Sequence, residues 1–100
     1  TWVACASAVS CLGGIPVLID IDPNTLCMSL AAAEKAITSR TKGILLIHLH
    51  CRLGDIPQFV QLARSRQIFL IEDCSQSHGS EWRHKRAGTF GDVGIFSMHQ

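Results

Sequence analysis

The feature that most constrains the fold is a series of short runs in which almost every residue is apolar. Three of them have the length of β-strands, at residues 15–22, 43–49 and 68–71. A strand that is apolar on both faces must be covered on both, as in parallel sheets packed between helices. Each connection is long enough to hold the crossover helix that a parallel pair requires. The sequence therefore predicts an α/β fold with a mainly parallel sheet and helices on both faces.

The segments before and between these runs carry helical spacing and the residues that begin and end helices. Helices are predicted over residues 2–12 and 30–37, and over a third segment that ends near Arg66. Gly13-Gly14 suit a helix C-terminus, and Ser29 can cap the helix that follows it.

The last part of the chain has a different character, because glycine recurs between short polar and apolar stretches. Four glycines punctuate it, at positions 79, 88, 91 and 94. This pattern predicts a hairpin-like stretch and then a last apolar strand at residues 93–97.

Composition and charge disfavour several classes of protein. One hundred residues, 47% of them hydrophobic and 17% charged, suffice for one modest core and at most one domain. A formal net charge of +1, with acids and bases interspersed, gives no extended field for nucleic acid or anionic lipid. The basic cluster at residues 83–86 is more simply a solvated hairpin tip. We expect no nucleic acid partner and no membrane, since no apolar run approaches about 20 residues.

The five cysteines form an odd set without CxxC spacing. Several lie in apolar segments, where a free thiol behaves as a small hydrophobic side chain. This pattern favours a reducing compartment, and the cytoplasm is the expected location. The chain also opens without methionine at Thr1 and stops directly after an apolar run at Gln100. Both ends are therefore expected to be cut, and a lost N-terminus would hide a signal peptide.

Three polar strings follow predicted strands, where ligands bind in open parallel sheets. They are residues 48–51, 72–76 and 97–100. Taken singly, their side chains have simple structural interpretations, with Asp73 as the cap of a turn and Gln76 as a solvated loop amide. Ser97 suits a strand-end hydroxyl bonded to nearby backbone.

A metal site and a cysteine nucleophile are the alternatives at these strand ends. His48 and His50 point to one face of a strand, and three further side chains could converge on them: Cys51, Cys74 and His78. No CxxC or HxxxH spacing supports this set, so packed or hydrogen-bonded side chains are favoured and no metal is expected. A nucleophile made of Cys74 and His78 is disfavoured, because acidic neighbours oppose formation of the thiolate.

Read together, several strings resemble one family in the same order along the chain. They are Thr1-Trp2-Val3-Ala4, PVLIDIDP at 16–23, Ala36-Ile37 with Thr41-Lys42, His48-Leu49, EDCSQSHG at 72–79 and GDVGIFS at 91–97. The chain resembles the DegT/DnrJ/EryC1/StrS aminotransferases, which have the aspartate aminotransferase fold, almost without gaps over all 100 residues. The strings TWVACASAV, EDCSQ and FSMHQ are most similar to the branch that aminates keto-inositols in aminoglycoside antibiotic pathways.

The resemblance implies that residues 1–100 are an internal segment of the large domain of a fold type I enzyme that uses pyridoxal phosphate. The upstream phosphate loop and the C-terminal small domain would lie outside the chain. Asp73 matches the family's carboxylate beside the ring nitrogen, and Gln76 the side chain that approaches the ring hydroxyl. Ser97 matches a hydroxyl that binds the cofactor phosphate. Trp2, which alone would suggest a core aromatic, matches the one that stacks over the ring.

The resemblance assigns no catalytic residue within the chain. The lysine that would form the Schiff base is expected shortly after Gln100. Lys35 lies in a predicted surface helix, Lys42 before a strand and Lys85 at the hairpin tip, so none is placed for this role. A piece without that lysine is predicted to have no transaminase activity.

The function that the resemblance implies is transfer of an amino group from L-glutamine or L-glutamate to the ketone of a cyclitol or nucleotide sugar. The mechanism would be ping-pong, in a homodimer whose active site lies at the subunit interface. Two alternatives stay open: relatives with histidine in place of the lysine dehydrate deoxysugars, and a degenerate relative would bind a ligand without catalysis. A generic nucleotide-binding module is less favoured, because neither GxGxxG nor GxxxxGK(S/T) occurs.

Two positions depart from the family pattern. His50-Cys51 stands where the family usually has Tyr-Gly, in a loop that borders the substrate region. At the hairpin tip, His84 or Lys85 replaces a glycine, and a tight turn with positive φ would be less comfortable. We therefore expect a looser turn there.

Overall fold

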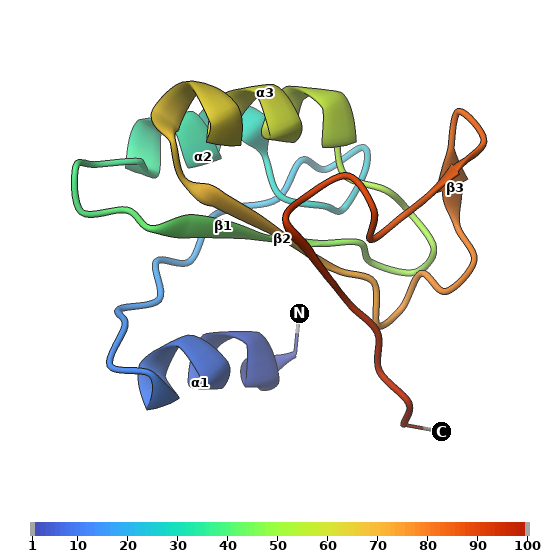
Figure 1. Ribbon diagram of the computed structural model, residues 1–100, viewed down its shortest axis with the longest axis horizontal. Helices are drawn as coiled ribbons and strands as arrows, with labels where there is room; N and C mark the ends of the chain where they lie inside the picture. Colours follow the sequence, from blue (N-terminus) through green and yellow to red (C-terminus); the bar gives the residue numbers. More distant parts are fainter. Residues whose placement is uncertain (1, 100) are drawn as a thin grey trace.

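The computed structural model describes residues 2–99, in which a small parallel sheet lies between helices (Figure 1). The helices are α1 (Val3–Cys11), α2 (Leu30–Ala36) and α3 (Ile56–Arg66), and the strands are β1 (Gly43–Ile47), β2 (Phe69–Asp73), β3 (Glu81–Trp82), β4 (Lys85–Arg86) and β5 (Val93–Ile95). No helix within this range has the length and apolar character needed to cross a membrane.

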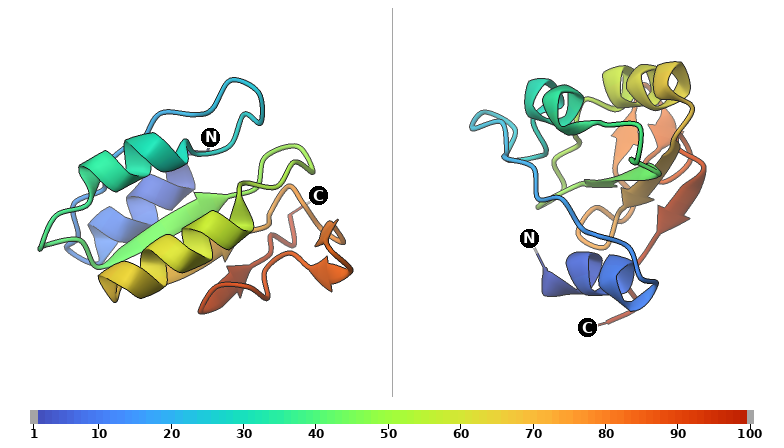
Figure 2. Two further views of the ribbon diagram at one scale, coloured as in Figure 1. Left: turned by 90° about the horizontal axis from the view of Figure 1, so that it is seen from above. Right: turned by 90° about the vertical axis from the view of Figure 1, so that its left-hand side faces the viewer.

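The main sheet has the strand order β1-β2-β5, and both pairs of strands are parallel. β2 is therefore central, and its last residue, Asp73, pairs with Ile47 of β1 and with Ile95 of β5. The helices α2 and α3 cover one face of the sheet, and α1 lies across the other face (Figure 2). The predicted α/β fold with a mainly parallel sheet and helices on both faces is confirmed.

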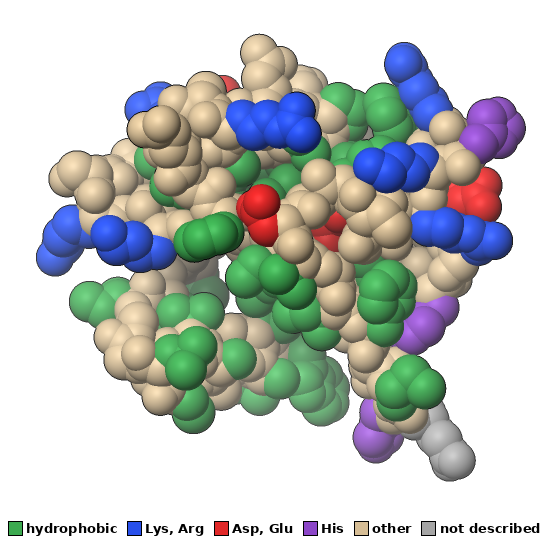
Figure 3. All heavy atoms as spheres, in the orientation of Figure 1, with side chains coloured by type: hydrophobic (Ala, Val, Ile, Leu, Met, Phe, Trp, Pro, Cys, Tyr) green, Lys and Arg blue, Asp and Glu red, His purple; other side chains and the backbone are tan. Residues whose placement is uncertain are grey.

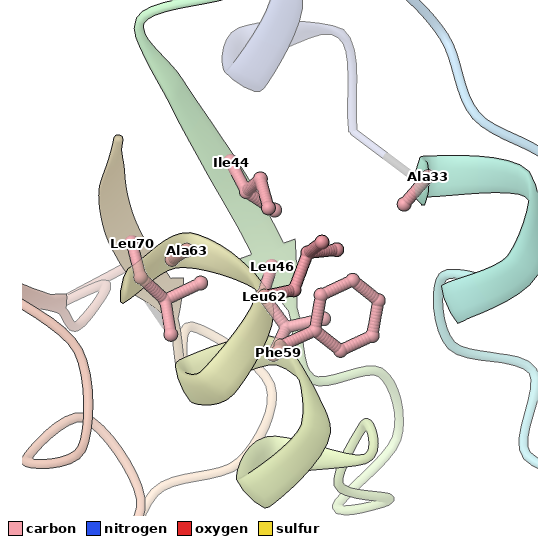
Figure 4. Close-up of a cluster of buried hydrophobic side chains, with 7 residues drawn as sticks. All are labelled: Ala33, Ile44, Leu46, Phe59, Leu62, Ala63 and Leu70. Atoms are coloured by element: carbon pink, nitrogen blue, oxygen red, sulfur yellow. The ribbon is translucent and has the colours of Figure 1, made fainter. Parts of the chain in front are cut away.

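The core lies between the sheet and the α2/α3 layer. Alternate strand residues point into it, because successive side chains in a strand face opposite sides. Leu46 of β1 and Leu70 of β2 pack in one cluster with Phe59, which is 0% exposed on α3 (Figure 4). Burial of such a side chain stabilises a fold by roughly 1.5–3 kcal/mol. Since α1 buries no residue, this layer is the apolar core of the described chain.

The sequence signals for the ends of helices are confirmed. Ser29 Oγ accepts a hydrogen bond from a backbone N–H in the first turn of α2, at 3.4 Å. At the end of α1, the N–H groups of Gly13 and Gly14 donate to the carbonyls of Ser10 and Val9, and Gly13 has a φ of 76°. This pattern is a Schellman motif, which favours glycine because of the positive φ.

The predicted strand at residues 15–22 is wrong. The segment is extended between α1 and α2, but within the described chain it forms a single antiparallel bridge, from Ile21 to Met28. Leu18, in the middle of the run, is 85% exposed. Pro16 lacks a backbone N–H, and no strand of residues 2–99 lies alongside the run to form a ladder with it. The apolar composition indicated that the segment needs burial, but burial does not require that it pair as a β-strand.

The looser turn expected at the hairpin tip is also wrong. β3 and β4 pair across a two-residue turn in which Arg83 and His84 have φ values of 49° and 63°. Two positive φ angles fit a type I′ turn, at a cost of roughly 1–2 kcal/mol for each residue other than glycine. Side-chain contacts offset part of this cost, because the Arg83 guanidinium lies 4.6 Å from the centre of the Trp82 ring.

Candidate functional site

Asp73 ends the central strand, so its side chain lies at the carboxyl end of the sheet. It is 9% exposed, and its Oδ2 accepts a hydrogen bond from Cys5 Sγ of α1 at 3.2 Å. Its Oδ1 accepts from the N–H of Ser75 at 2.9 Å. The interpretation of Asp73 as the cap of the following turn is therefore confirmed. The contact with α1 shows that the carboxylate also faces the second layer of the fold.

Hydrogen bonding holds Asp73 in its ionised form. Burial alone would raise the pKa of this carboxyl, but hydrogen bonds from Ser75 and Cys5 outweigh burial and lower the pKa below its ordinary value of 3.8. At neutral pH the carboxyl end of the sheet therefore presents a fixed negative charge in a nearly enclosed position. Such a carboxylate can accept a charge-assisted hydrogen bond from a cationic N–H group, including that of a protonated pyridine ring.

Gln76 lies in the turn after β2 and joins this turn to the loop after β1. Its Oε1 accepts a hydrogen bond from the N–H of His50 at 3.3 Å, and its backbone carbonyl accepts from the N–H of Cys51 at 2.9 Å. Gln76 is exposed, as expected for a loop amide. His50 and Cys51 have φ values of 51° and 59°, which are uncommon for residues other than glycine. The two residues that depart from the family pattern thus form a strained turn beside Gln76.

Ser97 follows β5, the strand that pairs with β2 at Asp73. β5 ends at Ile95, so the predicted strand at residues 93–97 is too long. The Oγ of Ser97 accepts a hydrogen bond from the N–H of His99 at 3.1 Å, which confirms its interpretation as a hydroxyl bonded to nearby backbone. Ser97 still places a hydroxyl after the end of β5, which lies next to β2, the strand that carries Asp73.

Trp2 immediately precedes α1 and is 75% exposed, which disagrees with a core aromatic and leaves its ring open to stack on another molecule. Cys5, one turn farther along α1, contacts Asp73. Apolar side chains gather over α1 on this side of the molecule (Figure 3). The start of α1 therefore adds a thiol to the carboxyl edge of the sheet, and the exposed Trp2 lies one turn away from that thiol along the chain.

None of the lysines in residues 2–99 forms an ion pair or a hydrogen bond with Asp73. Lys42 precedes β1, and its carbonyl accepts the N–H of Phe69 at the amino ends of the strands, opposite to Asp73. Lys35 lies in the last turn of α2, and the Lys85 ammonium lies 4.5 Å from the centre of the Phe90 ring.

Glu72 is a buried charged residue for which the sequence predicted no role. It is fully buried on the α2/α3 side of β2, and its Oε1 accepts the N–H groups of Phe90 and Gly91, both at 2.7 Å. Its Oε2 accepts the N–H of Gly88 at 2.9 Å and a hydrogen bond from His48 Nε2 at 3.1 Å. A charged residue inside an apolar strand was the available signal, since a buried carboxylate needs partners.

The hydrogen bonds to Glu72 determine its charge. Burial alone would raise the pKa of this carboxyl, but hydrogen bonds from His48 and from the backbone at Gly91, Gly88 and Phe90 lower it from 4.5 to about 2. The N–H of Gly54 donates to His48 Nδ1 at 3.2 Å, so the ring hydrogen lies on Nε2 and points at Glu72. One buried anion thus connects the loop after β1 with the loop before β5.

This network also bears on the metal alternative. His48, Glu72 and Cys74 are buried, and their possible ligand atoms lie within 4.8 Å of one another. Both ring nitrogens of His48 already have hydrogen-bond partners, and each Glu72 oxygen accepts two hydrogen bonds. His48 and Glu72 are therefore explained as a hydrogen-bond network, and Cys74 as a buried thiol beside it. The remaining candidates, His50, Cys51 and His78, are exposed and do not join it.

Cys74 does not have the character of a nucleophile. Its side chain is 0% exposed, and burial, followed by the charges of Glu72 and Asp73, raises the pKa of its thiol to about 12. His78, the base that such a nucleophile would need, is exposed and packs edge-on against the Phe96 ring, with 5.6 Å between ring centres.

Comparison with known proteins identifies relatives over the whole chain. The family model described as the DegT/DnrJ/EryC1/StrS aminotransferase family matches residues 1–100. An L-glutamine:2-deoxy-scyllo-inosose aminotransferase of Micromonospora echinospora is 48% identical over 98 residues, which cover 98% of this chain and 23% of that protein. The chain thus spans about a quarter of the length of such relatives.

Solved structures agree with this result. The aminotransferase TlmJ from Streptoalloteichus hindustanus superposes with a TM-score of 0.94 at 31% identity, over 99% of this chain and 27% of that chain. An E. coli GDP-4-keto-6-deoxy-D-mannose-3-dehydratase, solved with bound hydrated PLP, gives 0.84 at 31% identity over 91% of this chain and 23% of that chain. The predicted fold, part of the large domain of a fold type I pyridoxal phosphate enzyme, is confirmed.

Proposed function

Because the chain belongs to the DegT/DnrJ/EryC1/StrS aminotransferase family, we propose that the protein containing it is a pyridoxal phosphate-dependent aminotransferase. The proposed reaction moves an amino group from L-glutamine or L-glutamate to the ketone of a cyclitol or nucleotide sugar. The observation that carries this proposal is the ionised, nearly buried Asp73 at the carboxyl end of the central strand.

The residues at this edge fit the cofactor. Pyridoxal phosphate supplies an electron sink, and a protonated ring nitrogen deepens it. Asp73 would hold the hydrogen on that nitrogen, because its carboxylate is ionised and each oxygen, with one partner, can accept a further hydrogen bond. Gln76 would approach the ring hydroxyl, Ser97 would bind the phosphate, and Trp2 would stack on the ring. The exposure of Trp2 supports the last assignment.

The substrate class is proposed from the relatives. The protein of Micromonospora echinospora is named for 2-deoxy-scyllo-inosose and L-glutamine, and it is 48% identical to this chain. We therefore propose a keto-cyclitol as the acceptor and L-glutamine as the donor. His50 and Cys51 are the residues at which the acceptor would be selected, since they form the strained loop that donates to Gln76.

We further propose a homodimer in the cytoplasm. Several apolar side chains around α1 need cover, among them Leu12 and Leu18 at 90% and 85% exposure. The five cysteines are all free, which suits a reducing compartment.

The test uses the complete protein with added pyridoxal phosphate. A visible absorption band of the bound cofactor should appear and should disappear when L-glutamine is added. Asp73→Asn should weaken cofactor binding and abolish the response to L-glutamine, whereas Asp20→Asn, at an exposed aspartate, should change neither. A band that no amino donor alters would contradict the proposed reaction and favour a non-catalytic relative.

A deoxysugar dehydratase is the second candidate, since the E. coli dehydratase structure superposes on this chain at 31% identity. Product analysis separates the two reactions. Incubation with a keto-sugar and L-glutamine should yield an amino product if the protein is an aminotransferase. A product that has lost water and gained no nitrogen would replace the first proposal by the second.

A further inference from the structure

A thiol from the second layer touches the carboxylate on which the proposed function depends. Cys5 Sγ lies 3.2 Å from Asp73 Oδ2, in a contact between residues 68 positions apart in the chain. Burial, followed by the hydrogen bond and the charge of Asp73, raises the pKa of the Cys5 thiol to about 11. The group is therefore a protonated S–H at neutral pH, and it acts as a donor to the carboxylate.

The two oxygens of Asp73 are held by different parts of the fold. Ser75 N–H, in the turn that follows β2, donates to Oδ1, whereas Cys5, in α1, donates to Oδ2. The terminal torsion of an aspartate has a broad, nearly two-fold energy profile, so a single donor leaves the carboxylate plane free to rock. Donors on both oxygens restrict that motion, and one acceptor position on each oxygen stays available.

We propose that Cys5 is a positioning residue that orients the Asp73 carboxylate for the ring nitrogen of the cofactor. This inference rests on the proposed function and extends it to a residue of α1. Since α1 buries no side chain, packing alone does not fix its distance from the sheet. The Cys5–Asp73 hydrogen bond therefore also ties the helix that begins after Trp2 to the strand that carries the carboxylate.

The first test measures cofactor binding by the complete protein as a function of pH. Cys5→Ala removes the donor and should weaken binding of pyridoxal phosphate by about threefold to tenfold, because a thiol is a weak donor to a charged acceptor. It should also move the acid limb of the binding profile to higher pH, since loss of a hydrogen bond to the ionised form raises the pKa of Asp73.

Two variants show whether donation, and not helix packing, causes the effect. Cys5→Ser keeps a donor at the same position and should bind the cofactor within about twofold of the unchanged protein, with the acid limb restored. Cys11→Ala removes an exposed thiol from the same helix and should behave like the unchanged protein. The proposal would be overturned if Cys5→Ala and Cys5→Ser both bound the cofactor weakly, or if both bound it like the unchanged protein.

The second test needs no cofactor. In the cofactor-free complete protein, Cys5 should react with iodoacetamide far more slowly than it does in the urea-unfolded protein, as quantified by mass spectrometry of each site. Asp73→Asn removes the anionic acceptor, lowers the pKa of the Cys5 thiol and should raise its alkylation rate severalfold, while the rate at Cys11 stays constant. An unchanged rate at Cys5 would refute the hydrogen bond itself.

The two tests fail in different ways. If the unchanged protein binds no pyridoxal phosphate, the proposed function is wrong, and the role of Cys5 toward a cofactor is wrong with it. If the protein binds pyridoxal phosphate but Cys5→Ala binds it with unchanged affinity and pH profile, only the positioning role is wrong.

Discussion

Replacing Glu72 by glutamine should loosen the carboxyl end of the sheet, although the two side chains have the same shape. The carboxylate accepts four hydrogen bonds and donates none. In one orientation, the new amide nitrogen meets the N–H groups of Phe90 and Gly91. In the other, it meets the N–H of Gly88 and the Nε2–H of His48. Either way, two buried donors lose their acceptor.

The magnitude can be worked out in two ways from the same four hydrogen bonds. A buried polar group left without a partner costs roughly 1–3 kcal/mol, so two of them cost roughly 2–6 kcal/mol. The hydrogen bonds also lower the pKa of Glu72 from 4.5 to about 2. At about 1.4 kcal/mol for each tenfold change, this difference corresponds to about 3 kcal/mol of stability at neutral pH. Glu72→Gln should therefore lower the free energy of unfolding by about 3 kcal/mol.

The loss of stability in Glu72→Gln should appear first in the loop before β5. Amide hydrogen exchange in the cofactor-free complete protein should show faster exchange at residues 88–91, whose N–H groups lose their acceptor, while α3 keeps its protection. Urea denaturation of the same sample gives the change in stability. Glu81→Gln is the matched control, because Glu81 forms an exposed ion pair with Arg86 at 3.0 Å that should contribute at most about 1 kcal/mol.

Acid provides a further check on Glu72. A carboxyl whose pKa is lower in the folded state stabilises that state fully above its unfolded pKa, and this contribution is lost as the pH falls through its folded pKa. For Glu72 the loss should extend from about 4.5 down to about 2. In Glu72→Gln this part of the pH dependence should vanish. A variant that loses less than about 1 kcal/mol and keeps slow exchange at residues 88–91 would refute the reasoning.

Three further tests on the complete protein concern the packing and the hairpin, the first two by denaturation and the third by hydrogen exchange. Phe59→Ala should cost about 3–5 kcal/mol, because the ring is fully buried, whereas Phe69→Ala, at a side chain that is 66% exposed, should cost far less; equal losses would contradict the described core. His84→Gly should stabilise the hairpin by up to about 1 kcal/mol, since glycine adopts the observed φ of 63° freely, and a loss of stability would argue against the type I′ turn. Gly94→Ala should disrupt β5, because a β-carbon there would overlap the backbone of Gly88; normal hydrogen-exchange protection of β5 in this variant would show that the two segments are farther apart.

The sequence predicted the helices well, and it predicted well those strands that have a partner strand within the described chain. β1, β2 and all three helices were expected, because apolar periodicity and end signals such as Ser29 and Gly13 act locally. The run at residues 15–22 has the same apolar character as β1 but has no partner strand among residues 2–99. Apolar composition indicates that a segment needs burial. A strand also needs a hydrogen-bonded partner strand, and the sequence of the segment itself does not show whether one is present.

The candidate site shows the same division between local and distant information. The strand-end positions of Asp73, Gln76 and Ser97 followed from the strand pattern, and their proposed roles from the family strings. The hydrogen bonds that lower the pKa values of Asp73 and Glu72 could not be predicted, because Cys5 is 68 positions from Asp73 and His48 is 24 positions from Glu72. At the hairpin tip, a looser turn was predicted because of the cost of positive φ, but the stacking of Arg83 on Trp82 was not visible in the sequence.

At the end of β2, Glu72 has a structural role and Asp73 has the proposed role in cofactor binding. Adjacent residues of a strand face opposite layers, so the two carboxylates use separate sets of donors although they are neighbours in sequence. Glu72 fixes the loops that lead out of β1 and into β5, the two strands that flank Asp73. The position of Asp73 is then fixed by its neighbouring strands, while its carboxylate oxygens can still accept hydrogen bonds from a ligand. Loosening Glu72 should therefore weaken binding at Asp73 indirectly, whereas altering Cys5 should change the ionisation of Asp73 itself.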